Sequence, residues 1–204
     1  MGFIKQQPTP GSNVISKLSA GDRQLADKIE ADFHSLFLES HRTQLRARAG
    51  DPVYLPAASA TDLSQIIYSN HFWRSALHEL AHWFIAGRQR REQRDYDYWY
   101  QPERSKAKLQ RDFLAAEIKP QALEWHLCSA LGQDFFVSLD SFGEDQETLH
   151  WFRTAVKDEA LRRLRSELPT RAMKLVDYWL RESAQRDAYL EYWRSISLSD
   201  RLPG

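Results

Sequence analysis

The segment ALHELAHWF, residues 76–84, places His78, Glu79 and His82 in the pattern HExxH. On a helix, residues four apart share one face at a separation of about 6 Å, so two imidazoles can point at one metal ion. Glu79 is turned away from His78 by about 100°, but it can reach over such a site as a base or as a partner of a ligand. The surrounding residues are uncharged and mostly apolar. We therefore predict a metal site; the alternative is two helix-face histidines that bond to water or backbone.

A third ligand is needed, because two histidines alone bind a metal weakly. The three-histidine pattern HExxHxxGxxH fails, since positions 85 and 88 are Ile and Arg. The segment AAEIKPQALEW offers Glu117 and Glu124, which are seven residues apart and can share a helical face. We favour Glu117, because its neighbours are apolar and a nearby proline can re-aim its side chain. Glu124 is the fallback; otherwise it is a solvated helix carboxylate.

Two histidines and one carboxylate suit two metals. With zinc they form a peptidase-like site, in which a bound water attacks a carbonyl and Glu79 is the base. With iron(II) they form the facial triad of non-haem oxygenases. The residue types and their spacing leave both open. No histidine is followed two residues later by Asp or Glu, so the chain lacks the HxD motif of the common 2-oxoglutarate oxygenases.

Other residues near this segment could contact a substrate. His71 lies seven residues before His78 and would share its helical ridge, about 10 Å away, either facing a substrate channel or exposed to solvent. The segment DYDYWY contains Asp97, Tyr98 and Trp99, and its carboxylates and rings could hold a cation or simply pack on the core. The arginine-rich segments 87–94 and 104–111 could dock an acidic macromolecule or form a solvated face.

The first half of the chain must position the HExxH segment. We expect residues 1–20 to be a disordered tail, because they are polar and contain prolines and glycine. Apolar residues at helical spacing predict a helix over 22–40, and β-branched and aromatic residues predict strands over 53–57 and 64–69. The metal helix should follow, capped by Ser69 or Asn70 and ending near Gly87.

The second half is expected to supply the carboxylate and the rest of the core. Residues 104–131 read as a helix that Pro120 interrupts or kinks and Gly132 stops. Residues 134–142 are a strand candidate, and two or three amphipathic helices should follow, with breaks at Pro169 and near 183–184. Cys128 and the C-terminal Trp and Tyr residues fit core packing. We predict an α+β, mainly helical domain over 21–200, with C-terminal helices from about 145 and compatible with a zincin-like helix arrangement.

Composition narrows the function. The 204 residues carry 28 basic and 28 acidic side chains, and this zero net charge argues against a general nucleic-acid binder. The single cysteine excludes an intrachain disulfide framework and a cysteine-based zinc site. The N-terminus has no signal-peptide pattern and no apolar run is long enough for a membrane helix. We therefore expect a cytoplasmic protein with no direct nucleic-acid or membrane partner.

Four segments together resemble a known family. VYLPA, ALHELAHWFIAG, DYDYWYQP and EIKPQALEW occur in this order, and the series is similar to that of the bacterial elongation factor P hydroxylases. The resemblance runs from about residue 25 to 140, and more loosely to about 180. Position 118 is Ile where the family has Val, and position 124 is Glu where Asp also occurs. HExxH alone is shared with many zinc peptidases, whereas the tryptophan-containing segments are not typical of peptidases.

The resemblance implies a metal enzyme, most simply with Fe2+, that uses dioxygen to hydroxylate a β-lysylated lysine of elongation factor P. It implies His78, His82 and Glu117 as ligands and a cytoplasmic location, and it does not assign 2-oxoglutarate as the electron donor. In this interpretation Glu79 orients a ligand or handles a proton, DYDYWY receives the lysine, and the arginine-rich segment docks the acidic factor. The alternatives are a zinc metallopeptidase with Glu79 as general base, and a non-catalytic binding protein of the translation machinery.

Overall fold

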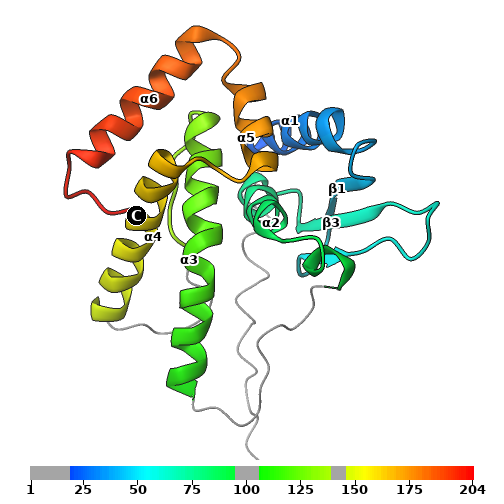
Figure 1. Cartoon of the computed structure of the whole chain (residues 1–204), viewed down its shortest axis with the longest axis horizontal. Coiled ribbons are helices and arrows are strands. Elements are labelled where there is room, and N and C mark those ends of the chain that lie inside the picture. Colours follow the sequence, from blue (N-terminus) through cyan, green and yellow to red (C-terminus); the bar gives the residue numbers. More distant parts are fainter. Residues whose placement is uncertain (1–18, 95–105, 139–145) are drawn as a thin grey trace, which may run out of the picture.

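The computed structural model describes residues 19–94, 106–138 and 146–204, without the side chains of 106–110. Its described part has a mainly helical α+β fold with a small sheet, as predicted (Figure 1). The elements, in chain order, are α1 (Ala20–Phe37), β1 (Thr43–Arg48), β2 (Val53–Leu55), β3 (Ser64–Ser69), α2 (Trp73–Ile85), η3 (Arg90–Glu92), α3 (Lys106–Ala130), α4 (Gln146–Ser166), α5 (Thr170–Trp179) and α6 (Ser183–Ser197). Most of the tail expected over 1–20 lies outside the described residues. Among the helices that the structure describes, none combines the length and apolar character that crossing a membrane requires.

The sheet has three strands in the order β1-β3-β2. β1 runs parallel to β3, with Leu45 opposite Ile66, and β2 runs antiparallel to β3, with Val53 opposite Ile67. The strands predicted over 53–57 and 64–69 are present as β2 and β3. β1 was not predicted, because the segment TQLRAR has arginines at two of its six positions and Thr43 is its one β-branched residue.

Helix α1 covers the sheet and fixes its position. Its N-terminus is closed by a capping box between Ser19 and Asp22, in which each side chain accepts from the other residue's backbone N–H. Its apolar residues repeat every three or four positions, at Ala26, Ile29, Phe33 and Phe37, and all four are fully buried. Glu30 then ties α1 to the sheet by accepting hydrogen bonds from the Tyr68 hydroxyl and the Ala47 amide.

Helix α2 lies between the sheet and α3 (Figure 1). It begins at Trp73, with Phe72 at the N-cap position and no side-chain cap, so the predicted cap at Ser69 or Asn70 is wrong. Asn70 and His71 instead adopt left-handed backbone conformations in the turn before the helix. The chain uses this turn to reverse from β3 into α2, which leaves neither of these two residues with the extended geometry of an N-cap.

Helix α3 is the central helix, with α4, α2 and α6 around it (Figure 1). It continues through Pro120, so the predicted interruption is wrong. Residues 120–128 are all buried, and packing on every side holds the helix together where the proline removes one backbone hydrogen bond. The helix ends before Gly132, which adopts a positive φ of 66° as expected for a residue beyond a helix C-terminus.

The C-terminal part forms α4, α5 and α6, with breaks at 167–169 and at 180–182, close to those predicted. Cys128, Trp179 and Trp193 are buried in the core, as predicted. The strand candidate over 134–142 is wrong for 134–138, which have no regular secondary structure, and 139–142 lie outside the described residues. Val137 donates its amide to the carbonyl of Gly204 instead of joining the sheet.

Candidate metal centre

Three side chains from two helices converge between α2 and α3. His78 and His82 lie one turn apart on α2, and Glu117 comes from α3. The Nε2 atoms of His78 and His82 are 3.1 Å apart. Glu117 Oε2 lies 3.6 Å from His78 Nε2 and 3.4 Å from His82 Nε2. The structure thus brings together the two histidines of the HExxH segment and the carboxylate favoured from the sequence.

The spacing of these atoms suits a metal ion. The point equidistant from the three atoms, in their common plane, lies about 2.0 Å from each, close to the length of a metal–nitrogen or metal–oxygen bond. Glu117 Oε2 is buried and has no hydrogen-bond partner in the described part of the chain. A buried carboxylate oxygen without a hydrogen bond is costly, and a metal ion between it and the two imidazoles would supply the missing interaction. The cluster therefore fits a divalent metal ion.

Glu124 holds one of the two imidazoles in place. Its Oε2 lies 2.9 Å from His78 Nδ1, and its side chain is almost fully buried. A carboxylate can only accept, so Nδ1 carries the hydrogen and, in the neutral ring, the lone pair is on Nε2. Burial lowers the pKa of His78, but the hydrogen bond and charge of Glu124, with the charges of Glu117 and Glu79, raise it overall to about 10.

The sequence did not predict this role for Glu124. It is not the solvated carboxylate that was the alternative to a ligand, because it is 2% exposed. The spacing of the residues could have indicated this position, since Glu117, Gln121 and Glu124 share one face of α3. A metal-binding histidine usually donates its second ring N–H to a carboxylate, and Glu124 stands where such a partner is needed.

Glu117 is kept ionised by its neighbours. Burial raises the pKa of the Glu117 carboxyl, but the adjacent His82 and His78 imidazoles outweigh burial and hold it below its usual value. Gln121 lies one turn further along α3, where it donates to the Ser138 carbonyl and accepts from the Ser138 amide. These bonds fix the segment after Gly132 against α3 beside Glu117.

Glu79 lies on the rim of the cluster. It lines a small pocket together with His82, and the other lining residues are Tyr54, Ile66, Trp83, Ala86, Arg90 and Arg91. About a quarter of the His78 side chain and a third of the His82 side chain are exposed, against 8% of the Glu117 side chain. The two imidazoles are therefore partly exposed whereas the carboxylate is buried, and Glu79 lines a pocket that reaches His82.

The other sequence candidates have different outcomes. The prediction that His71 lies on the helical ridge of His78 is wrong, because α2 begins two residues later. The His71 Nε2 atom pairs with Asp27 Oδ1 of α1 at 2.7 Å on the surface. Asp97, Tyr98 and Trp99 lie outside the described residues, so their contact with a substrate remains a prediction.

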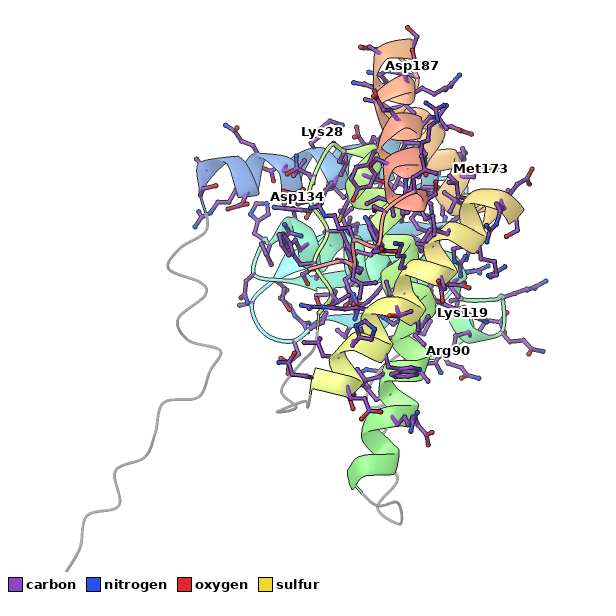
Figure 2. The ribbon with its side chains drawn as sticks, turned by 90° about the vertical axis from the view of Figure 1, so that its left-hand side faces the viewer. Lys28, Arg90, Lys119, Asp134, Met173 and Asp187 are labelled. Atoms are coloured by element: carbon purple, nitrogen blue, oxygen red, sulfur yellow. The ribbon has the colours of Figure 1, made fainter. Side chains whose placement is uncertain are left out.

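A larger cavity lies away from the histidines. It has a volume of about 440 Å³ and its walls come from α1, the end of α3 and α6, with Lys28 and Asp134 among its lining residues. It shares no residue with the pocket beside His82. In Figure 2, Lys28 and Asp134 lie toward the upper left, whereas Arg90, from the pocket beside His82, lies toward the lower right. The larger cavity is therefore separate from the pocket beside the histidine cluster.

The fold and this cluster define the class: a mainly helical α+β protein with two histidines and one glutamate able to hold a divalent metal. The family model described as elongation factor P hydroxylase matches residues 32–191. The chain belongs to this family. A protein of Haemophilus influenzae, named elongation factor P lysine hydroxylase, is 38% identical over 149 residues, which cover 73% of this chain and 84% of that protein. The matched region includes both α2 and α3, which carry the cluster.

Proposed function

We propose that this protein hydroxylates the β-lysylated lysine of translation elongation factor P, as a monooxygenase that depends on a non-haem iron ion. One observation carries the proposal: His78, His82 and Glu117 meet in a chain of the elongation factor P hydroxylase family. Two histidines and one carboxylate on one side of an ion are typical of non-haem iron(II) oxygenases. The name of the Haemophilus influenzae relative supports the same substrate.

Three side chains would bind the ion. His78 and His82 would bind it through Nε2, and Glu117 through Oε2. When bound, iron(II) would supply the activation of dioxygen, so that one oxygen atom enters a C–H bond of the substrate and the other leaves as water, with two electrons from a separate reductant and two protons. Glu124 keeps the Nδ1 hydrogen of His78, so that Nε2 stays available as a ligand. Glu117, buried on the α3 side, excludes water there, so that substrate and dioxygen approach from the exposed side of the imidazoles.

Glu79 is proposed as the catalytic carboxylate that is not a ligand. It lines the pocket that reaches His82. From there it can hold or deliver a proton while oxygen is reduced, without taking a place on the ion.

The substrate lysine is cationic, and this suggests which residues receive it. Asp97, Tyr98 and Trp99 would surround an ammonium group with a carboxylate and two rings. His71 is a further substrate-binding candidate, in the turn before α2. Because the substrate is a translation factor, we place the protein in the cytoplasm.

An intact-mass comparison tests the proposal. β-Lysylated elongation factor P is purified after co-expression with the wild-type protein, with the His78→Ala/His82→Ala variant, or with neither. We expect a gain of one oxygen atom only with the wild type and only when iron is supplied. An unchanged mass with folded, iron-loaded protein would refute the function.

The same ligands could hold zinc in a peptidase, which is the alternative activity. The family match does not favour it. Incubation of the zinc-loaded protein with a peptide library separates the two, since cleavage that depends on Glu79 would support the peptidase and oppose the hydroxylase.

A further inference from the structure

Three permanent cations gather where α2 ends, and two of them come from a distant part of the chain. Arg91 lies in η3, whereas Arg171 and Lys174 come from α5. Arg171 and Arg91 place their guanidinium carbons 4.5 Å and 5.9 Å from the centre of the Trp83 ring. Lys174 Nζ lies 5.5 Å from the centre of the Phe37 ring, which itself contacts Trp83. We call Arg91, Arg171 and Lys174 the basic cluster.

Backbone carbonyls and ring faces hold these cations, not carboxylates. Arg171 Nη2 donates to the carbonyls of Trp83, Phe84 and Ala86, and Arg91 Nη1 donates to that of Ala86. Lys174 has only a long contact of 3.4 Å to the Leu36 carbonyl. Among the described residues, no carboxylate forms an ion pair with any of the three.

Helix capping accounts for only part of this arrangement. The last carbonyls of α2 attract a cation, and Arg171 alone contacts three of them. The pKa of Arg171 is lowered to about 10, mainly by burial and further by the nearby charge of Arg91. Lys174 adds a third charge near His41, whose pKa is lowered by burial and by the charges of all three. Crowded like charges repel, and an anionic partner would relieve that repulsion.

The basic cluster is next to the metal centre. Arg91 lines the same pocket as His82 and Glu79. Figure 1 shows the start of α5 beside α2, on the side of the molecule where the sheet also lies. A macromolecule whose reacting residue enters beside the exposed parts of the two imidazoles would therefore cover these cations.

We propose that the basic cluster is a docking surface for an acidic face of the protein substrate, next to the residue that is modified. This inference rests on the proposed function, which makes the substrate a folded protein. Three cations on a chain of zero net charge suit a local acidic patch better than nucleic acid, whose binders typically neutralise about six to ten phosphates. The surface would act mainly on encounter and affinity, and little on the chemical step.

Lys174→Glu is the test variant, because Lys174 is exposed and its 3.4 Å contact with the Leu36 carbonyl at the end of α1 is longer than the contacts that Arg91 and Arg171 make with the end of α2. Arg186→Glu on α6 is the matched control, since it makes the same charge change at another exposed position. With intact β-lysylated elongation factor P we expect Lys174→Glu to raise KM about threefold to tenfold with kcat unchanged. The wild-type KM should also rise with salt between about 0.05 M and 0.3 M. Arg186→Glu should match the wild type.

Binding measured by calorimetry separates this inference from the proposed function. If Lys174→Glu weakens binding of the factor severalfold and Arg186→Glu does not, the docking surface is supported even when the wild type hydroxylates nothing. Equal KM and equal affinity for the two variants would overturn the docking surface and leave the function standing. Binding of a poly(U) oligonucleotide that Lys174→Glu abolishes, with unchanged affinity for the factor, would overturn it in favour of nucleic acid.

Discussion

Replacement of Glu124 should weaken metal binding without removing a ligand. The carboxylate accepts from His78 Nδ1 at 2.9 Å and is 2% exposed, so solvent screens this bond little. Glu124→Gln keeps the size of the side chain and an acceptor oxygen but removes the charge. Glu124→Ala removes the acceptor and leaves the Nδ1 hydrogen of His78 buried without a partner. The two variants therefore separate the effect of charge from the effect of orientation.

The expected magnitudes follow from the type of hydrogen bond. A bond to a charged acceptor contributes about 1 kcal/mol more than a bond to a neutral one, so Glu124→Gln should weaken metal affinity about fivefold to tenfold. Loss of the hydrogen-bond partner of a metal-binding histidine lowers the affinity for the metal about 10-fold to 100-fold, and we expect this loss for Glu124→Ala. His78→Ala, which would lose a ligand, should bind the metal more weakly than both Glu124 variants.

Titration with Co2+ or Fe2+ under anaerobic conditions, followed by calorimetry, gives these affinities directly. Glu147→Gln, an exposed carboxylate at the start of α4, is the control for the change of charge. Thermal unfolding of each metal-free variant shows whether the fold is intact. Wild-type affinity in Glu124→Ala would refute the orienting role. A loss as large as that of His78→Ala would instead make Glu124 a ligand.

Two further results are expected. Glu79→Gln should abolish most hydroxylation while the protein still binds metal with wild-type affinity, because Glu79 lines the pocket without being among the three clustered ligands; unchanged turnover would remove it from the mechanism. The pKa of His126 is lowered to about 4, mainly by burial. The hydrogen bond to the Ala160 carbonyl raises this pKa, and the charge of Arg163 lowers it by a smaller amount. As the pH falls, the unfolded chain therefore binds a proton at this histidine before the folded chain does. The free energy of unfolding should be unaffected by this group above about pH 6.5 and should fall by up to about 3 kcal/mol as the pH drops to 4. Denaturant unfolding of the wild type and of His126→Gln across this pH range measures the free energy of unfolding of each. The same pH dependence in both proteins would contradict this prediction.

Periodicity predicted the helices well because their buried faces are regular. Residues 26, 29, 33 and 37 of α1 repeat at helical spacing, and all are buried. The second half of α3 is different, since residues 120–128 are buried on every side and have no amphipathic pattern. Its helical state could be read from composition, but its central position could not. The same packing explains why Pro120 does not end the helix.

The errors fall where tertiary contacts override local signals. β1 contains arginines at positions 46 and 48, which look unfavourable for a strand, yet it pairs along its full length with β3 and packs under α1. The turn at Asn70 and His71 depends on two left-handed residues, and side-chain type alone predicts a cap there instead. Residues 133–138 are held by Gln121 and by the chain end at Gly204, which are distant in sequence.

That His78, His82 and Glu117 lie together could be predicted from the sequence, but the different positions of the two carboxylates could not. The spacing of Glu117 and Glu124 identified two carboxylates for one role, and only the geometry distinguishes them. Glu117 faces both Nε2 atoms, whereas Glu124 contacts the opposite nitrogen of His78. Arg171 and Lys174 lie some 90 residues from the HExxH segment, and no local pattern connects them with it.

The polar side chains inside α3 supply an independent argument for the metal. Among the side chains of α3 that the structure describes, four polar ones are buried: Glu117, Gln121, Glu124 and His126. Gln121 bonds to Ser138, Glu124 to His78, and His126 to the Tyr189 hydroxyl and the Ala160 carbonyl. Within the described part of the chain, Glu117 is the one of these four side chains with a buried oxygen, Oε2, that has no hydrogen-bond partner. A core that pairs the other three of these buried side chains would gain stability from a cation at that oxygen, so metal loading should stabilise the fold as well as enable the chemistry.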